Sequence, residues 1–370
     1  PIYQKSNYFK GCGEWGLGVV HTFGNVESLH GNLQDLIDRT QAIVANPRRG
    51  NLTGFYISPE SFHHNFLYYD LVTELAWNPK GVTLDNFLRR YSIRRYGEES
   101  APEMAAAWKL VAETVYGDNE AANPTPTYQD PLPMATGSPD TAFTQEVKKR
   151  IGYIPKLRKA VAMAEHAANV WPTKKEEKQM PTKKYAIDLL DDCVIAVAST
   201  PSWLEQHAAE ELARYVQAMT GALLPICTWN SAQRKEAKSL VFVGQRFKDE
   251  GTEKFVIKTK GTQPKTLMLI GSRPRATLYA VYDFLEKECG VGFFEDGDHI
   301  PKKTTLRFGP IDRTEKPYFT RRVAPSPCAY TYTAQFWGVE EWKTQVDYMA
   351  KRKLNTFYWT RGGGTGMART

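Results

Sequence analysis

The fold prediction starts from residues Gly54–Trp77, GFYISPESFHHNFLYYDLVTELAW, which indicate a buried strand, an exposed acid and a helix in direct succession. Apolar and polar residues alternate over the first five positions, and Pro59 then removes a backbone donor and ends regular pairing. Apolar residues next recur mostly every three or four positions, which is typical of an amphipathic helix. This order is one unit of a (β/α) barrel, in which catalytic groups lie on the loops after the strands. Glu60 is therefore a candidate catalytic carboxylate, and the alternative is a solvated loop acid.

A second strand with its loop precedes this unit. Residues 15–24, WGLGVVHTFG, form a short apolar run that leads into a polar loop bounded by glycine, and residues 33–44 have helical spacing. Four polar residues of the loop could line a pocket for a polar ligand: His21, Asn25, Glu27 and His30. A histidine in such a loop is more often a structural hydrogen-bonding group, so both interpretations stay open.

Composition and charge exclude several classes of protein. The chain has 370 residues with 42% hydrophobic and 12% aromatic content, enough for two or three folded cores. Its net charge is +7, but the basic residues are scattered, so we expect no nucleic-acid partner. Five cysteines without a CxxC pair or a histidine cluster predict no metal site and no cofactor. No apolar run approaches the roughly 20 residues that span a bilayer, so we expect no membrane partner.

The N-terminus carries no signal-peptide pattern. Because the sequence begins at Pro1 and not at Met, we expect a trimmed or partial chain, and a lost signal peptide stays possible.

The second half of the sequence predicts a small α/β sandwich and then the start of a barrel. Short apolar runs at 194–197, 240–244, 255–258 and 266–271 indicate strands, and 202–219 and 275–288 indicate helices. Residues 318–329 are expected to be extended, followed by a helix over 341–353 and a strand over 354–359. The helix should turn four apolar residues inward: Trp342, Val346, Met349 and Ala350. Residues 361–370, RGGGTGMART, contain no core-forming residues.

The predicted fold class is α/β, with partial (β/α) barrel segments, a helical domain and a small α/β sandwich domain. Helical spacing over 84–96, 102–116 and 146–171 defines the helical part, and the charged run WPTKKEEKQMPTKK at 171–184 is typical of a linker. The expected segments are barrel strands and helices at 1–80, the helical domain at 81–171, a linker at 172–184, the small α/β domain at 185–310 and the start of a barrel at 311–370.

These motifs resemble the α-N-acetylglucosaminidase family of glycoside hydrolases in two blocks. Residues 15–116 resemble the end of the family's barrel and the start of its helical domain through HTFGNVESLHGNL, YISPESFHHNFLYYDLVTELAW and AAWKLVAETVY. Residues 194–360 resemble the family's opening through GSRPRATLYAVYDFLEKECGVGFFE and PCAYTYTAQFWGVEEWKTQVDYMAKRKLN. The tail therefore precedes the head, and the middle barrel strands are absent. A partial reading frame or a joined sequence explains this order better than a natural rearrangement, because a circular permutation would keep the middle strands.

The resemblance implies retaining cleavage of terminal α-linked N-acetylglucosamine, with a glycan as the partner. Glu60 matches the family's nucleophile, whereas the family's acid/base glutamate comes from the missing middle and is not in this chain. The positions that match family substrate contacts are His21, Phe23, Asn65, Cys328 and Tyr330. Ser326 stands where the family commonly has an asparagine, which departs from its pattern for recognising the sugar. The family also implies a secreted, periplasmic or lysosome-like location.

Two other functions stay open. Half a barrel with sugar-facing aromatic residues could be a non-catalytic carbohydrate-binding or scaffold protein. The small domain at 194–310 also resembles the domain that precedes α-glucuronidase-like barrels. We expect the chain alone to be inactive or nearly so, because too few strands are present to close a barrel. The sequence does not predict the natural glycan, its linkage or the oligomeric state.

Overall fold

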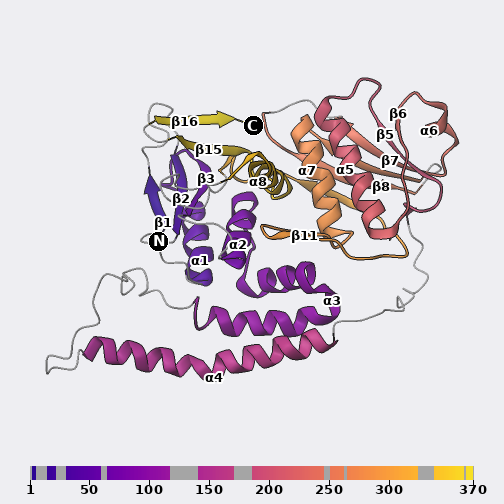
Figure 1. Cartoon of the computed structure of the whole chain (residues 1–370). Coiled ribbons are helices and arrows are strands. Elements are labelled where there is room, and N and C mark those ends of the chain that lie inside the picture. The colour runs from indigo at the N-terminus through magenta and orange to yellow at the C-terminus, as the bar shows by residue number, and fades with distance from the viewer. Residues whose placement is uncertain are drawn as a thin grey trace. The chain divides into compact units, whose positions relative to one another are not determined.

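The computed structural model describes residues 2–5, 15–21, 31–59, 65–116, 141–170, 186–245, 251–261, 265–323, 337–361 and 364–369 (Figure 1). The chain forms two compact units, each built from separated segments. Unit 1 contains Pro1–Pro172, Arg321–Thr344 and Leu354–Thr370, and unit 2 contains Thr173–Thr320 and Gln345–Lys353. Helices and strands are mixed in both, which confirms the α/β class. The division into five segments stays a prediction.

Unit 1 contains a six-stranded sheet with the order β1-β2-β3-β14-β15-β16. Its strands are β1 (Ile2–Lys5), β2 (Trp15–His21), β3 (Leu52–Pro59), β14 (Arg321–Val323), β15 (Thr356–Arg361) and β16 (Gly364–Arg369). The four inner strands are parallel, and the two outer strands are antiparallel to their neighbours. The strands predicted from the start and the end of the sequence therefore pair directly, β3 with β14. The described strands form an open sheet and not a closed barrel.

Neighbouring strands of this sheet pack closely on both of its faces. Leu17 and Phe55 are buried, at no more than 1% exposed, and lie on the same face as the buried Arg322, whose guanidinium lies 5.1 Å from the Trp77 ring centroid. On the opposite face, a Cβ atom on Gly18 would lie 1.8 Å from the Tyr56 ring. Only glycine leaves room for this tyrosine on the neighbouring strand.

The helices of unit 1 differ from the sequence expectation in two places. They are α1 (Leu33–Ala45), α2 (Phe66–Trp77), α3 (Leu84–Ala112), α4 (Thr141–Val170) and the first half of α8 (Val339–Lys351). The two helices predicted over 84–96 and 102–116 are confirmed as the halves of α3. They meet directly at a kink at Gly97 (φ 79°, ψ 164°) and not through a loop, and the second half ends at Ala112; Figure 1 shows the two rods. The amphipathic pattern expected for α2 was wrong, because every residue of α2 except Phe66 and Glu74 is buried.

Unit 2 contains a second six-stranded sheet with the order β13-β8-β9-β7-β5-β6. Its strands are β5 (Cys193–Val197), β6 (Ile226–Thr228), β7 (Ser239–Gln245), β8 (Phe255–Lys260), β9 (Lys265–Gly271) and β13 (Asp312–Glu315). β6, β5, β7 and β9 are parallel, whereas β8 and β13 are antiparallel to their neighbours. The strands and the two long helices predicted for this region are confirmed within one or two residues at most ends.

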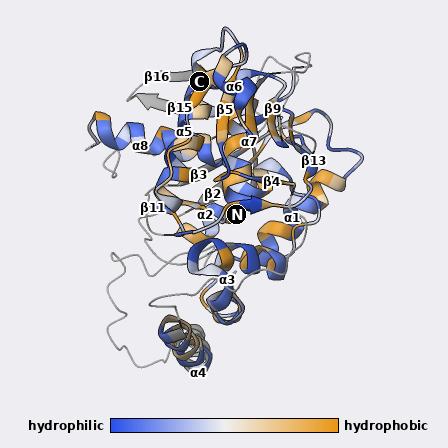
Figure 2. Cartoon of the chain, turned by 90° about the vertical axis from the view of Figure 1, so that its right-hand side faces the viewer, coloured by the Kyte–Doolittle hydropathy of each residue, from blue (hydrophilic) through white to orange (hydrophobic). Residues whose placement is uncertain are grey.

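Helices and short strand pairs complete unit 2. They are α5 (Trp203–Thr220), α6 (Ala232–Glu236), α7 (Pro274–Lys287), the pair β10 (Gly292–Phe294) and β11 (Gly297–His299), and the pair β4 (Ile187–Asp188) and β12 (Arg307–Phe308). Figure 1 shows α5 and α7 side by side. All five residues of β5 are buried, as in a parallel strand covered on both faces, and the strands near it are largely orange in Figure 2.

A buried carboxylate ties α7 to residues that follow α8 in unit 2. Asp283 is fully buried and lies 3.1 Å from the Nζ atoms of Lys287 and Lys353 and 2.9 Å from Arg313. Burial alone would raise the pKa of this carboxyl, but the three cations outweigh burial and lower its pKa. The charged form is therefore the one that the fold stabilises.

Two further expectations for the C-terminal region need correction. Val346 does not face inward with Met349, because its side chain is 44% exposed whereas Met349 is 2% exposed. Residues 361–370 were expected to add nothing to a core, yet Gly364–Arg369 form β16, whose backbone pairs with β15. Of the extended segment expected over 318–329, the described part contains β14.

Candidate functional site

The predicted site residues follow the carboxyl ends of three neighbouring strands. β2 and β3 are parallel and end at the same level, where the Cα atoms of His21 and Pro59 are partners. β14 lies on the other side of β3, and Val323 at its end is the partner of Tyr56. The segments after these three strands therefore start from one edge of the sheet, where parallel α/β proteins carry their sites.

Most of the predicted side chains fall outside the described residues. Glu60, Phe23, Cys328 and Tyr330 lie there, and His21 is described by its backbone alone. Their roles stay predictions. Asn65 is the one candidate of the set whose side chain the structure describes, so the site is built outward from it.

Asn65 is fully buried at the start of α2. Its Oδ1 accepts a hydrogen bond from the Tyr116 hydroxyl at 2.5 Å, and Tyr116 is also fully buried. An asparagine that precedes a helix usually caps it, but this side chain makes no such bond to α2. Asn65 therefore joins the beginning of α2 to the turn that follows α3. Its predicted contact with substrate stays a prediction.

Tyr68 lies one turn along the same helix and packs on Gly31. Gly31 has φ +101°, a conformation that favours glycine, and a Cβ atom there would lie 2.7 Å from the Tyr68 ring. Tyr68 is 4% exposed. The residue that ends the segment after β2 is thus fixed against α2 as well.

Burial keeps both tyrosines neutral. It raises the pKa of the Tyr68 and Tyr116 hydroxyls well above the ordinary value; Asp35 adds to the shift at Tyr68, and Tyr68 adds to the shift at Tyr116. The Tyr116 hydroxyl therefore keeps its proton and remains a hydrogen-bond donor across the range in which proteins are folded.

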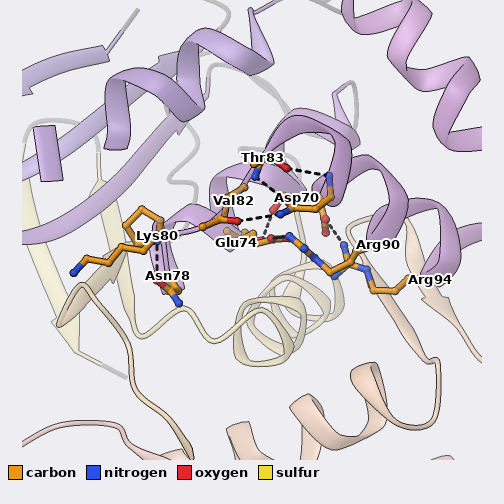
Figure 3. Close-up of polar contacts among 12 residues, drawn as sticks. Asp70, Glu74, Asn78, Lys80, Val82, Thr83, Arg90 and Arg94 are labelled. Carbon is orange, nitrogen blue, oxygen red and sulfur yellow. Dashed lines mark hydrogen bonds and ion pairs between the residues drawn. The ribbon is translucent and has the colours of Figure 1, made fainter. Parts of the chain in front are cut away.

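Two ion pairs hold α2 against α3, and Figure 3 shows the four side chains from the two helices meeting. Asp70 pairs with Arg94 at 2.5 Å, with side chains 3% and 10% exposed. Glu74, one turn further along, pairs with Arg90 in a more exposed position. The helix that follows the Glu60 segment is thus anchored along its length.

The described part of the chain contains no group of three or more histidine, cysteine, aspartate or glutamate side chains that could hold a metal ion. Among the helices described here, none has the length and apolar content needed to cross a bilayer.

Sequence reasoning missed Tyr116, Tyr68 and Gly31. Tyr116 ends one segment with helical spacing, and Tyr68 lies within another such segment. In the sequence, neither can be distinguished from an ordinary aromatic residue of the core. Gly31 follows a polar loop in which several residues could end the segment. The one available signal was the glycine itself, since a glycine just before a helix often marks a positive φ.

Residues 1–79 match the sequence profile described as the Alpha-N-acetylglucosaminidase (NAGLU) tim-barrel domain. This part of the chain is thus related to the barrel of a glycoside hydrolase family, and the predicted resemblance is confirmed. The matched range contains β1, β2, α1, β3 and α2, and Asn65 directly precedes α2.

Among individual proteins, the chain is similar to the human α-N-acetylglucosaminidase, with 30% identity over 122 residues. That alignment covers 31% of this chain and 15% of the human protein, so the chain spans only a small part of its relative. Two structures of a family 89 glycoside hydrolase from Clostridium perfringens, one with GlcNAc-alpha-1,4-galactose and one with PUGNAc, align with a TM-score of 0.30 and 15% identity. Each alignment covers 42% of this chain and 16% of that chain.

Proposed function

We propose that this chain is a glycoside hydrolase-like protein that contributes to retaining cleavage of terminal α-linked N-acetylglucosamine, with Glu60 as the nucleophile. The match of residues 1–79 to an α-N-acetylglucosaminidase barrel domain carries the proposal. The parallel strands β2, β3, β14 and β15 support the finer interpretation of a partial (β/α) barrel. The same relationship leads us to propose a glycan substrate and a secreted, periplasmic or lysosome-like location.

Retaining hydrolysis uses two carboxyl groups about 5 to 5.5 Å apart, one as nucleophile and one as general acid and then base. Glu60 would attack the anomeric carbon and form a covalent glycosyl intermediate, while the second group protonates the leaving oxygen. No residue of this chain is assigned to the second role. General acid help typically contributes about 10²- to 10⁴-fold, so we expect the chain alone to turn over ordinary glycosides barely or not at all.

A donor whose leaving group needs no proton tests the nucleophile by itself. With 2,4-dinitrophenyl α-N-acetylglucosaminide, attack by Glu60 displaces dinitrophenolate without an acid, so we expect a burst that approaches one equivalent per chain. Mass spectrometry should find the sugar on the peptide that contains Glu60. The burst and the adduct should disappear in Glu60→Gln and persist in the control Glu98→Gln, which changes an exposed residue of α3. A wild-type chain that shows neither would contradict the proposal.

One observation favours a second function, a non-catalytic carbohydrate-binding or scaffold protein. Within the described residues, antiparallel β1 and β16 occupy both edges of the parallel strands, so the sheet is complete as an open sheet. Saturable binding of N-acetylglucosamine by isothermal titration calorimetry, with no burst from the activated donor, would select this alternative. A burst only from the matching glucuronide donor would select an α-glucuronidase-like enzyme.

A further inference from the structure

Three consecutive basic residues at the end of α8, 351–353, each pair with a carboxylate of unit 2. The pairs are Lys351 with Asp298 of β11 at 2.7 Å, Arg352 with Glu286 of α7 at 2.7 Å, and Lys353 with Asp283 of α7 at 3.1 Å. None of the three basic side chains is more than 10% exposed, and all six residues belong to unit 2. These are therefore buried ion pairs, which solvent screens much less than pairs on the surface.

The Lys351 ammonium is enclosed by aromatic rings and a second carboxylate. Its Nζ lies 5.8 Å from the ring centroids of Tyr215 and Phe293 and 2.5 Å from Asp347, one turn back in α8. The Tyr215 hydroxyl also donates to Asp298 at 2.5 Å. Burial alone would lower the pKa of this ammonium, but Tyr215, Asp298 and Asp347 outweigh burial and raise its pKa. The surroundings therefore stabilise the charged lysine.

Lys353 makes its ion pair from an unfavourable backbone conformation. Its φ is +60°, in the left-handed region, where a residue with a side chain is strained. Its amide donates to the Ala350 carbonyl at 3.0 Å and so closes the end of the helix. Glycine is the usual residue in such a turn, because it adopts this conformation without strain. A glycine would supply no cation to Asp283, so we attribute the lysine to the side-chain contact and not to the turn.

We propose that residues 351–353 are a docking segment, which the carboxylates of α7 and β11 recognise and which completes unit 2. The small α/β domain expected over 185–310 is then incomplete without a segment that lies beyond it in the sequence. The chemistry that these carboxylates recognise is a run of three cations at the end of a helix. The proposal is independent of the proposed function, because it involves neither Glu60 nor a glycan.

Replacing Lys353 by glycine tests the docking against the backbone strain. Lys353→Gly removes the strain and the cation together, so the sign of its effect shows which of the two dominates. If docking dominates, the urea midpoint falls, and hydrogen exchange in the full chain becomes about 10-fold faster over 274–287 and 345–353. The control is Asp192→Gly, which also replaces a residue of unit 2 with a positive φ, 44°, but has an exposed side chain. Its exchange over the same peptides should equal that of the wild type.

A second pair of variants tests Lys351 in the same way. Lys351→Met should accelerate exchange over 292–299 and 345–353, because it removes one partner of the buried pair with Asp298. Lys343→Met is the control on the same helix, since Lys343 pairs with Glu340 on the surface, and it should leave this exchange unchanged. A higher urea midpoint in Lys353→Gly would overturn the proposal. Wild-type exchange over 345–353 in both Lys353→Gly and Lys351→Met would overturn it as well.

Discussion

Asp70 and Arg94 form the most deeply buried of the ion pairs between α2 and α3 in the described part of unit 1. Asp70 lies five residues after Asn65 in α2, so the pair stabilises the packing of α2 against α3. A buried pair adds little net stability over well-packed apolar residues, but breaking it leaves an uncompensated charge. The neighbouring Arg90–Glu74 pair is more exposed, and solvent screens it.

Arg94→Ala should therefore lower the free energy of unfolding by about 3 to 5 kcal/mol, because it removes one partner of a buried ion pair. Arg90→Ala, one turn away between the same helices, should cost at most about 1 kcal/mol, because the Arg90 side chain is 43% exposed. Urea unfolding followed by circular dichroism measures both. Equal losses in the two variants would mean that the Asp70 pair is solvated in solution.

At this scale the sequence predicted Glu60 and Asn65 as candidate site residues but gave no sign of the hydrogen bond between Asn65 and Tyr116. A carboxylate recognised by a preceding proline and strand is a local pattern. The Asn65–Tyr116 bond joins residues from different elements, and no local pattern encodes which of many tyrosines reaches a given asparagine. The burial of Asp70 could not be predicted either, since an acid among apolar helical residues usually lies on the solvent-exposed side of the helix.

Among the helices, α3 shows what the sequence predicted and what it did not. Its two halves were recognised by their spacing, and the break was expected at the loop between them. The backbone instead turns at the single residue Gly97, and the second half starts again with Pro102 near its beginning, where proline is tolerated. The spacing of apolar residues predicted both halves of α3. The angle between the halves, however, depends on the positive φ of Gly97, which spacing does not encode.

Gly97→Ala should lower the free energy of unfolding by about 1 to 3 kcal/mol, because alanine must adopt φ 79°. The cause is the backbone alone, since no atom lies within 4 Å of a Cβ placed at Gly97. Gly152→Ala is the matched control: it also meets nothing within 4 Å but lies inside α4 without a positive φ, so alanine should stabilise it by about 0.5 to 1 kcal/mol. Thermal and urea unfolding of both variants should show opposite signs, and a stabilising Gly97→Ala would show that the kink is absent in solution.

For the whole molecule, the main surprise is that unit 1 is discontinuous. Sequence reasoning treated the strands near the start and the end of the chain as separate pieces of barrel, because nothing local in either block shows that they meet. In the structure β3 pairs with β14, with Gly54, Phe55 and Tyr56 as the partners of Arg321, Arg322 and Val323. The strands and helices of unit 2 were predicted more fully, and nearly all of them come from one continuous stretch of the chain, Thr173–Thr320.

The discontinuous sheet predicts how a cut chain behaves. If a protease site is inserted in the predicted linker at 172–184, cleavage yields two fragments, one with β2 and β3 and the other with β14 and β15. Because these strands form one sheet, the fragments should elute together in size-exclusion chromatography and separate only in denaturant. Val323→Pro is the control, since it removes a backbone donor in a central strand that has partners on both sides, so its cut fragments should separate at a lower urea concentration. Fragments that separate without denaturant, or a Val323→Pro variant that holds together as firmly as the parent, would show that β3 and β14 are not paired in solution.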